Sequence, residues 1–300
     1  MIRSLDQMVE KVISVNKKHR IAVAWAQDAN TAGAVYRSAC SGFADAIMIG
    51  EPDKIEEVCL NNNIPSGLFE IIGAENETAA AETAVKLVKT GDADIVMKGL
   101  VGTDIFLKAV MDKNLGLMQP DAVLTYVGAI EIPQYHKVLF ITDPAVIPYP
   151  GLKQKIAMTA YSIEMAHRFG IGIPKIALIG ASEKGSRHFL YSSDYAAIKI
   201  MAEKGEFGNC VIDGPLDLFL ACDRKSAGIK GVVTPVAGDA DILVFPSLES
   251  SNPFYKSIML FGHGELGGLI MGTTRPVVLM SRSESEKSKY YCIALACLMD

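Results

Sequence analysis

The sequence predicts an α/β fold with two domains, each built on a mostly parallel sheet. Short apolar runs rich in Val and Ile recur about every 25 to 40 residues, and stretches with apolar residues at helical spacing lie between them. The chain has 300 residues, of which 50% are hydrophobic. That length and composition fit one large domain or two medium ones, and two domains are expected.

The expected strands are continuous apolar runs, which are typical of parallel strands buried on both faces. In chain order they are Arg20–Trp25, Ala46–Gly50, Leu68–Ile72, Ile95–Lys98, Val138–Thr142, Lys175–Ile179, Cys210–Asp213, Ile242–Phe245 and Arg275–Ser281. The expected helices are Thr78–Lys89, Asp104–Lys113, Lys153–Phe169, Tyr195–Lys204 and, at the end of the chain, Glu286–Leu298. Open parallel sheets bind ligands beyond the carboxyl ends of their strands, so the residues after each strand are the first candidates for a site.

Two segments mark the expected crossovers between domains. Asp143–Gly151 contains three prolines, which interrupt regular structure. The second crossover is placed near Arg275–Ser281. We therefore expect one domain from residues 1–145 and 275–300 together, and a second domain from residues 146–274.

The composition limits the partners and the location. The net charge is only -5, and Lys and Arg are scattered, which argues against a nucleic-acid partner. No apolar run reaches the roughly 18 residues that span a bilayer, and the first twenty residues lack the apolar core of a signal peptide, so no membrane association is expected. The six cysteines form no CxxC pair and have no His at ligand spacing. This pattern indicates a cytoplasmic protein without a metal site.

The first candidate segment is Met97–Asp104, MKGLVGTD, where a strand gives way to a helix. Its glycines, including Gly99, allow the backbone to approach a ligand closely, and Thr103 opens the helix. A helix N-terminus with unpaired N–H groups can hold an anion such as phosphate, and Lys98 adds a positive charge. An ordinary strand-to-helix turn with a capping Thr or Asp would have the same sequence.

The second and third candidate segments also follow expected strands. In Thr142–Pro150, Asp143 comes at the end of a strand, where it can cap a turn, bind a ligand or steer a cation. A second carboxylate at metal-ligand spacing is missing there. In Pro235–Asn252, a strand leads at Pro246 into a serine-rich segment that ends at Asn252, which we expect to be a ligand-binding loop.

The fourth candidate segment is Arg275–Ser288, RPVVLMSRSESEKS. Ser281 and Arg282 emerge together from the expected strand. A planar guanidinium beside a hydroxyl suits a tetrahedral phosphate, although the same Arg could pair with a nearby glutamate instead. Arg275, which opens the segment, is also counted among the expected substrate-binding residues.

Two other features are assigned no catalytic role. Gly262–Gly267, GHGELG, matches the spacing of a dinucleotide-binding loop, but the residues before it, Asn252–Leu260, have a helical pattern rather than that of a first strand. No acidic residue follows at the expected distance. Its glycines are expected to allow close packing. The five histidines are dispersed, and none lies beside a nucleophile in a known motif.

Together and in this order, these segments resemble those of the phosphate acetyl/butyryltransferase family. The resemblance covers nearly the whole chain. It is carried by ADIVMKGLVGTD, FITDPAVIPYP, DGPL, GDADILVFPSLESSN and PVVLMSRSES, which are Ala93–Asp104, Phe140–Pro150, Asp213–Leu216, Gly238–Asn252 and Pro276–Ser285. The MKGL and SRxxS forms are closer to the butyryl branch. The resemblance implies a fold like that of the isocitrate and isopropylmalate dehydrogenases, with a cleft between the domains.

The resemblance also implies the activity and the residues that perform it. The family transfers short acyl groups between CoA and phosphate, with CoA as a substrate and without a bound cofactor or metal. By analogy, Arg282 holds the phosphoryl group, Ser281 lies near the thiol or the carbonyl, and the turn from Lys98 to Thr103 lines the acyl phosphate pocket. A homodimer or a larger homo-oligomer is expected as well.

The same resemblance leaves three points open. Acetyltransferase members have an Asp a few residues after the Ser–Arg pair as the base for the thiol, whereas this chain has Glu284–Ser288 there. The base is therefore unassigned. The acyl group could be acetyl rather than butyryl. Two alternatives to a phosphate acyltransferase exist on the same fold. One is a metal- and NAD-dependent dehydrogenase, and the other is an inactive CoA-binding relative.

Overall fold

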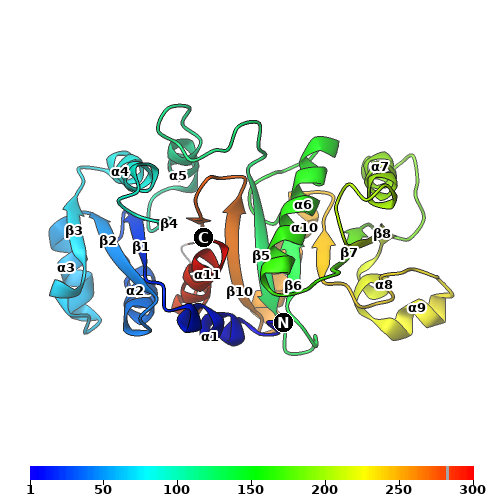
Figure 1. Cartoon of the computed structure of the whole chain (residues 1–300), viewed down its shortest axis with the longest axis horizontal. Coiled ribbons are helices and arrows are strands. Elements are labelled where there is room, and N and C mark those ends of the chain that lie inside the picture. The colour runs from blue at the N-terminus through cyan, green and yellow to red at the C-terminus, as the bar shows by residue number, and fades with distance from the viewer. Residues whose placement is uncertain (282–283) are drawn as a thin grey trace. The chain divides into compact units, whose positions relative to one another are not determined.

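The computed structural model describes residues 1–281 and 284–300, and the chain divides into two compact units (Figure 1). The terminal unit consists of Leu5–Leu124 and Leu266–Asp300, and the central unit consists of Met1–Ser4 and Thr125–Glu265. The units change at residues 125 and 266, whereas the sequence analysis placed the boundaries near residues 145 and 275. The difference arises because two strands that precede the Pro-rich segment pair within the central unit.

The sheet of the terminal unit has the strand order β3-β2-β1-β4-β11-β10. Its strands are β1 (His19–Ala24), β2 (Ala44–Gly50), β3 (Glu70–Gly73), β4 (Ile95–Lys98), β10 (Glu265–Met271) and β11 (Val277–Val278). Strand β10 pairs antiparallel with β11, and the other neighbouring strands are parallel. The interior of the sheet is apolar, as in the fully buried run from Ile21 to Ala24.

The helices of this unit cover both faces of the sheet (Figure 1). They are α1 (Leu5–Val15), α2 (Ala29–Cys40), α3 (Pro52–Asn61), α4 (Glu77–Thr90), α5 (Thr103–Val110) and α11 (Glu286–Met299), with a 3₁₀ turn at Ser66–Leu68. Helices α1 and α2 pack against α11, and α4 packs on β1 and β4. Because crossovers between parallel strands are right-handed, the chain changes face where it returns from β3 to β4. The carboxyl ends of β1 and β4 therefore form the switch point at which such sheets bind ligands.

The central unit has the strand order β5-β6-β9-β7-β8. Its strands are β5 (Thr125–Glu131), β6 (Leu139–Thr142), β7 (Lys175–Ile179), β8 (Val211–Leu216) and β9 (Ile242–Val244). Strand β5 is antiparallel to β6, and the remaining pairs are parallel. Its helices are α6 (Leu152–Arg168), α7 (Tyr191–Glu203), α8 (Leu218–Cys222), α9 (Arg224–Lys230) and α10 (Leu248–Phe261). The predicted α/β class with mostly parallel strands is confirmed in both units.

Helix boundaries follow local sequence signals. Helix α4 begins after Asn76, whose side chain accepts a hydrogen bond from the backbone N–H of Ala79. It ends at Gly91, whose φ of 86° is favourable only for a residue without a Cβ atom. Among the described residues, no helix is long and apolar enough to cross a membrane.

Several elements differ from the sequence analysis, and α2, α3, α8 and α9 were not among the expected helices. Strands β5 and β10 were not expected, and α10 replaces the loop expected from Pro246 to Asn252. In β10, two glycines weaken the strand signal, yet they allow α11 to lie close. A Cβ atom on Gly267 would lie 3.3 Å from the carbonyl oxygen of Tyr291. The expectation that this glycine serves close packing is confirmed.

Candidate active site

The carboxyl end of β4 places a buried lysine next to the end of β11. Lys98 is the last residue of β4 and is 2% exposed. Its ammonium group lies 3.1 Å from the carbonyl oxygen of Gly99 and 3.4 Å from that of Met280, the residue before Ser281. Strands β4 and β11 are parallel neighbours, so their carboxyl ends lie at the same edge of the sheet. The structure therefore brings together Lys98 and the segment that begins at Ser281.

The turn after β4 follows the end of β1 closely. The backbone N–H of Gly99 donates to the carbonyl oxygen of Ala24, and that of Leu100 donates to Trp25, at 2.9 and 2.8 Å. A Cβ atom on Gly99 would lie 2.5 Å from the Trp25 carbonyl oxygen, which is closer than real Cβ contacts. Glycine is therefore required at this position for the turn to have its observed path.

The start of α5 is partly occupied by a carboxylate of the chain itself. Thr103 is the first residue of α5, and both Thr103 and Asp104 are exposed. The backbone N–H of Gly102 donates to Oε2 of Glu77, at 2.7 Å. One N–H group of the expected anion-binding site, that of Gly102, thus already has an acceptor within the chain. The exposed first turn of α5 is the part that can face a ligand.

Ser281 is exposed and leads from β11 to α11. Its carbonyl oxygen accepts a hydrogen bond from the N–H of Glu284, at 3.2 Å. The hydroxyl of Ser285 caps α11 by accepting from the N–H of Ser288, at 3.0 Å. Arg282, the expected phosphate ligand, lies outside the described residues.

Helix α2 supplies a neighbour that the sequence analysis missed. The side chain of Asn30 donates to the carbonyl oxygen of Glu284, at 3.2 Å, so the start of α2 lies beside the segment after Ser281. Asp28 caps α2 through the N–H of Thr31, at 2.9 Å. Asp28 lies between β1 and α2, just as the turn before Thr103 lies between β4 and α5. A helix-capping residue soon after an expected strand is the sequence signal that could have identified Asp28.

Arg275 is not brought to this edge of the sheet. It precedes β11, and β11 is parallel to β4, so Arg275 lies at the amino ends of these strands and Lys98 at the carboxyl end of β4. Its guanidinium group lies 3.2 Å from Asp300, at the end of the chain. Arg275 was expected to share a site with Ser281. In the structure, β11 separates the two residues and places them at opposite ends of the strand.

Asp143 and Asn252 lie together in the central unit. Asp143 is 1% exposed and accepts hydrogen bonds from the hydroxyl of Thr125 and from backbone N–H groups of Tyr126 and Ala145–Ile147. Asn252 donates to the carbonyl oxygen of Pro144, at 2.8 Å. Burial raises the pKa of Asp143, and the hydrogen bond from Ala145 is the strongest influence opposing that rise. Both side chains hold the Pro-rich segment in place.

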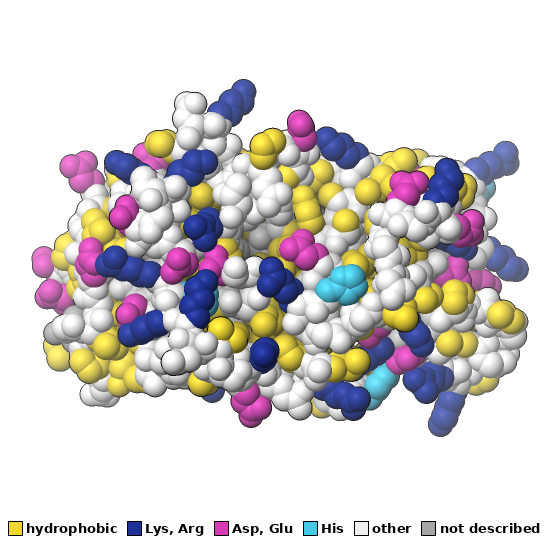
Figure 2. Space-filling model, viewed as in Figure 1, with side chains coloured by type: hydrophobic (Ala, Val, Ile, Leu, Met, Phe, Trp, Pro, Cys, Tyr) yellow, Lys and Arg dark blue, Asp and Glu magenta, His cyan; other side chains and the backbone are white. Residues whose placement is uncertain are grey.

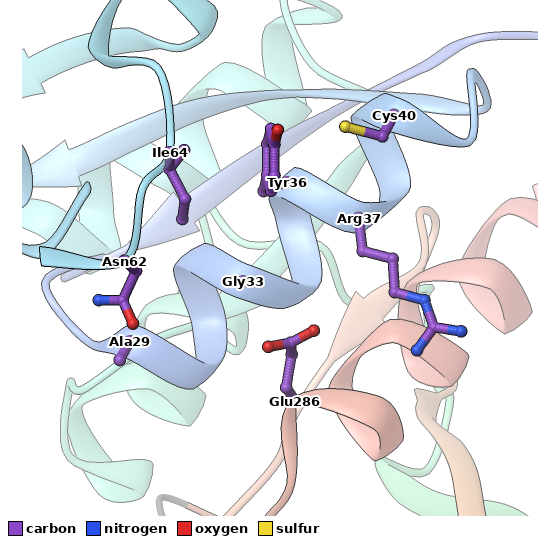
Figure 3. A pocket seen from close by; sticks show the side chains of 8 residues that line it. All are labelled: Ala29, Gly33, Tyr36, Arg37, Cys40, Asn62, Ile64 and Glu286. Carbon is purple, nitrogen blue, oxygen red and sulfur yellow. The ribbon is translucent and has the colours of Figure 1, made fainter. Parts of the chain in front are cut away.

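The unit that contains Lys98 also has a pocket on its α2 side. It has a volume of about 310 Å³ and is lined by Ala29, Gly33, Tyr36, Arg37, Cys40, Asn62, Ile64 and Glu286 (Figure 3). None of the residues expected to bind substrate lines it. We therefore place the candidate site at the ends of β4 and β11 and not in this pocket.

Charge on the molecular surface is mixed. Figure 2 shows basic and acidic side chains intermixed over the visible face. In the part of the chain that the structure describes, no group of three His, Cys, Asp or Glu side chains is placed to hold a metal ion. The absence of a nucleic-acid partner stays a prediction.

Comparisons with known proteins agree with the resemblance found in the sequence. A model of the family described as phosphate acetyl/butaryl transferase matches residues 77–297. The chain is 40% identical over 299 residues to a phosphate butyryltransferase of Clostridium acetobutylicum, covering 100% of this chain and 99% of that one. The crystal structure of a branched-chain phosphotransacylase from Enterococcus faecalis V583 superposes with a TM-score of 0.81 at 30% identity, covering 94% of this chain and 98% of that chain.

A more distant similarity concerns the fold alone. A 4-hydroxythreonine-4-phosphate dehydrogenase from Klebsiella pneumoniae superposes with a TM-score of 0.53 at 12% identity, covering 94% of this chain and 99% of that chain. The expected fold, shared between phosphate acyltransferases and a group of dehydrogenases, is thereby confirmed. Since the family model covers most of the chain and the identity to a curated relative extends over its full length, the chain belongs to the phosphate acetyl/butaryl transferase family and is a phosphate acyltransferase that acts on acyl-CoA and phosphate.

Proposed function

We propose that this phosphate acyltransferase converts butyryl-CoA and phosphate reversibly into butyryl phosphate and CoA. The full-length similarity to a phosphate butyryltransferase is the observation that supports this acyl group. Acetyl-CoA is the alternative, because the family includes acetyltransferases. A branched acyl group is a further possibility in view of the similar phosphotransacylase.

The proposed phosphate subsite consists of Lys98, Arg282 and the turn from Gly99 to Thr103. Lys98 supports this assignment because a buried ammonium group is costly and here has carbonyl oxygens as partners at the end of β4. A positive charge on this buried side chain would stabilise negative charge on a nearby phosphate more strongly than an exposed one. Arg282 would add two parallel donors to the same group.

The proposed reaction is a single acyl transfer. In the direction of acyl-CoA, the sulfur of CoA attacks the carbonyl carbon of the acyl phosphate and a C–S bond forms. The C–O bond to phosphate then breaks, phosphate leaves with the electron pair, and the thiol proton passes to phosphate or water. Ser281 is proposed to donate a hydrogen bond to the carbonyl oxygen as negative charge develops on it.

A dedicated base for the thiol is not required by the energetics. A thiol with a pKa of about 8.5 is roughly 3% ionised at pH 7, so full deprotonation lowers the barrier by at most about 2 kcal/mol. Alignment of thiol and acyl phosphate supplies about 7–11 kcal/mol. We therefore assign most of the catalysis to positioning and charge stabilisation.

CoA is proposed as a substrate, with no additional bound cofactor or metal, so turnover should resist EDTA. All six cysteines are free thiols, which supports the proposed cytoplasmic location. The expected homo-oligomer stays a prediction that light scattering can test.

The experiment that tests the proposed function is a kinetic series with acetyl-, propionyl-, butyryl-, isobutyryl- and valeryl-CoA and inorganic phosphate. The largest kcat/KM is expected for butyryl-CoA. A higher value for acetyl-CoA or isobutyryl-CoA would correct the acyl group. No CoA release with any of the five would contradict the proposed activity.

A further inference from the structure

A buried lysine on the first turns of α11 has no role in the reaction proposed above. The side chain of Lys289 is 3% exposed. Its ammonium group lies 3.0 Å from Oδ1 of Asp28 and 3.0 Å from the hydroxyl oxygen of Thr31. A buried ammonium group is tolerated only with such partners, so the position of Lys289 is tied to the start of α2.

Asp28 connects this ion pair to the edge of the sheet that carries Lys98. It lies between β1 and α2, and Oδ1 also accepts the capping hydrogen bond from the N–H of Thr31, at 2.9 Å. Oδ2 is buried and has no hydrogen-bond partner among residues 1–281 and 284–300. One carboxylate oxygen thus holds the starts of α2 and α11 together.

A second connection joins α2 to the segment between Ser281 and α11. Asn30 of α2 donates to the carbonyl oxygen of Glu284, and the N–H of Glu284 donates to the carbonyl oxygen of Ser281, both at 3.2 Å. Lys289 fixes the far side of the same segment, because it lies in the helix that Ser285 caps. The start of α2 therefore contacts the chain at Glu284, whose N–H donates to the carbonyl oxygen of Ser281, and at Lys289.

The packing of α2 against α11 extends these contacts. Glu286 lies beside the backbone of α2 at Gly33, as Figure 3 shows, and a Cβ atom on Gly33 would lie 2.5 Å from its carboxylate oxygen. Further along, the guanidinium group of Arg37 lies 4.1 Å from the centre of the Tyr290 ring. These contacts fix the first turns of α11 relative to α2.

Stability alone does not account for a lysine at this position. A buried ion pair is often no more stabilising than two well-packed apolar residues in its place, so stability does not require Lys289 and Asp28 at these positions. What an apolar side chain in place of Lys289 lacks is a fixed link to Asp28. We propose that Lys289 is a positioning residue that, through Asp28, holds the segment carrying Ser281 in the geometry required for acyl transfer. This inference rests on the proposed function.

The test compares the full-length wild type with Lys289→Met, Asp28→Asn and the double variant. A displacement of about 1 Å at a reacting group can reduce the rate by about 10²-fold. We expect Lys289→Met to lower kcat by about 10- to 100-fold, while KM for acyl-CoA changes less than about threefold. The double variant should lose no more than the more impaired single variant, because both changes break the same link.

Lys137→Met is the matched control. Lys137 is partly buried, at 19% exposure, and is paired with Asp241 at 2.6 Å near the amino end of β9. We expect this variant to lower the unfolding midpoint without changing kcat. A fall in kcat of the same size in Lys137→Met would show that loss of any inner ion pair impairs turnover, and would overturn the specific role of Lys289.

The remaining outcomes are also decisive. If folded Lys289→Met keeps kcat within threefold of the wild type, the positioning role is wrong and the proposed function is unaffected. If Lys289→Met does not fold, Thr31→Val, which preserves volume and removes one partner of Lys289, should lower kcat about 3- to 10-fold, and an unchanged kcat overturns the inference. A wild type without turnover on any acyl-CoA contradicts the proposed function itself.

Discussion

The ammonium group of Lys98 lies 3.4 Å from the carbonyl oxygen of Met280, so the end of β4 is linked to the residue that directly precedes Ser281. The two positions are 182 residues apart in the chain. Their proximity follows from the parallel pairing of β4 with β11, which places both carboxyl ends at one edge of the sheet. The charged side chain of Lys98 and the segment that carries the Ser281 hydroxyl therefore lie at the same edge of the sheet.

Replacing Lys98 by Met should lower kcat/KM by about 10²- to 10³-fold, which is typical for removal of one preorganised charge or donor from a reaction centre. The free energy of unfolding should change little, since an apolar side chain of similar length fills the buried site. Steady-state kinetics and thermal unfolding measure the two effects separately. A kcat/KM within threefold of the wild type, with normal folding, would remove Lys98 from the proposed phosphate subsite.

Replacing Gly99 by Ala should lower both stability and activity, because the added Cβ atom would lie 2.5 Å from the carbonyl oxygen of Trp25. Relief of this overlap moves the turn after β4 and costs about 1–3 kcal/mol. Gly172→Ala is the control, since a Cβ atom there meets nothing within 4 Å. Chemical unfolding and kinetics on both variants check the prediction, and equal behaviour of the two would contradict the close approach at Gly99.

Much of the fold could be predicted because buried parallel strands have a strong local signature, as in Ile95–Lys98. Strand β10 could not, since Gly267 lies close to the backbone of α11 and the N–H of Gly268 donates to the sulfur of Cys292, contacts that a local pattern does not contain. The first turns of helix α10 were expected as a loop because they contain serines and Asn252, whereas Asn252–Leu260 was expected to be helical and is. The side chains of those turns bond to carbonyl groups of Asp143 and Pro144 instead, which only the tertiary structure reveals.

In the candidate site, too, some features could be predicted from the sequence and others could not. Lys98 and Ser281 end expected strands and Gly99 follows one, so their shared edge could be inferred from strand direction. The pairing of Asp28 with Lys289 could not, because it joins residues 261 positions apart through the packing of two helices. The position of Arg275 could have been inferred from sequence, since Arg275 begins the expected strand that Ser281 ends.

The two arginines around β11 should therefore behave differently. Arg275→Ala should keep kcat and KM within about threefold of the wild type, since Arg275 is 44% exposed and paired with Asp300 away from Lys98. Loss of an exposed ion pair costs about 0–1 kcal/mol of stability. Arg282→Ala should lower kcat/KM by at least about 10²-fold if Arg282 holds the phosphate. Kinetics of both variants decide this, and a large loss in Arg275→Ala would return Arg275 to the substrate site.

Asp239 should make stability depend on pH. Burial alone would raise its pKa, but the ammonium groups of Lys175 and Lys137, which pair with its carboxylate, outweigh burial and hold the pKa well below its ordinary value. A carboxyl group with a lowered folded-state pKa stabilises the protein above its unfolded-state pKa of about 3.9, and the stabilisation is lost as the pH falls towards the folded-state pKa. Asp239→Asn should thus be less stable than the wild type at pH 7, and the difference should shrink below about pH 4. Urea unfolding at a series of pH values tests this, and a difference that stays constant from pH 7 to pH 3 would contradict it.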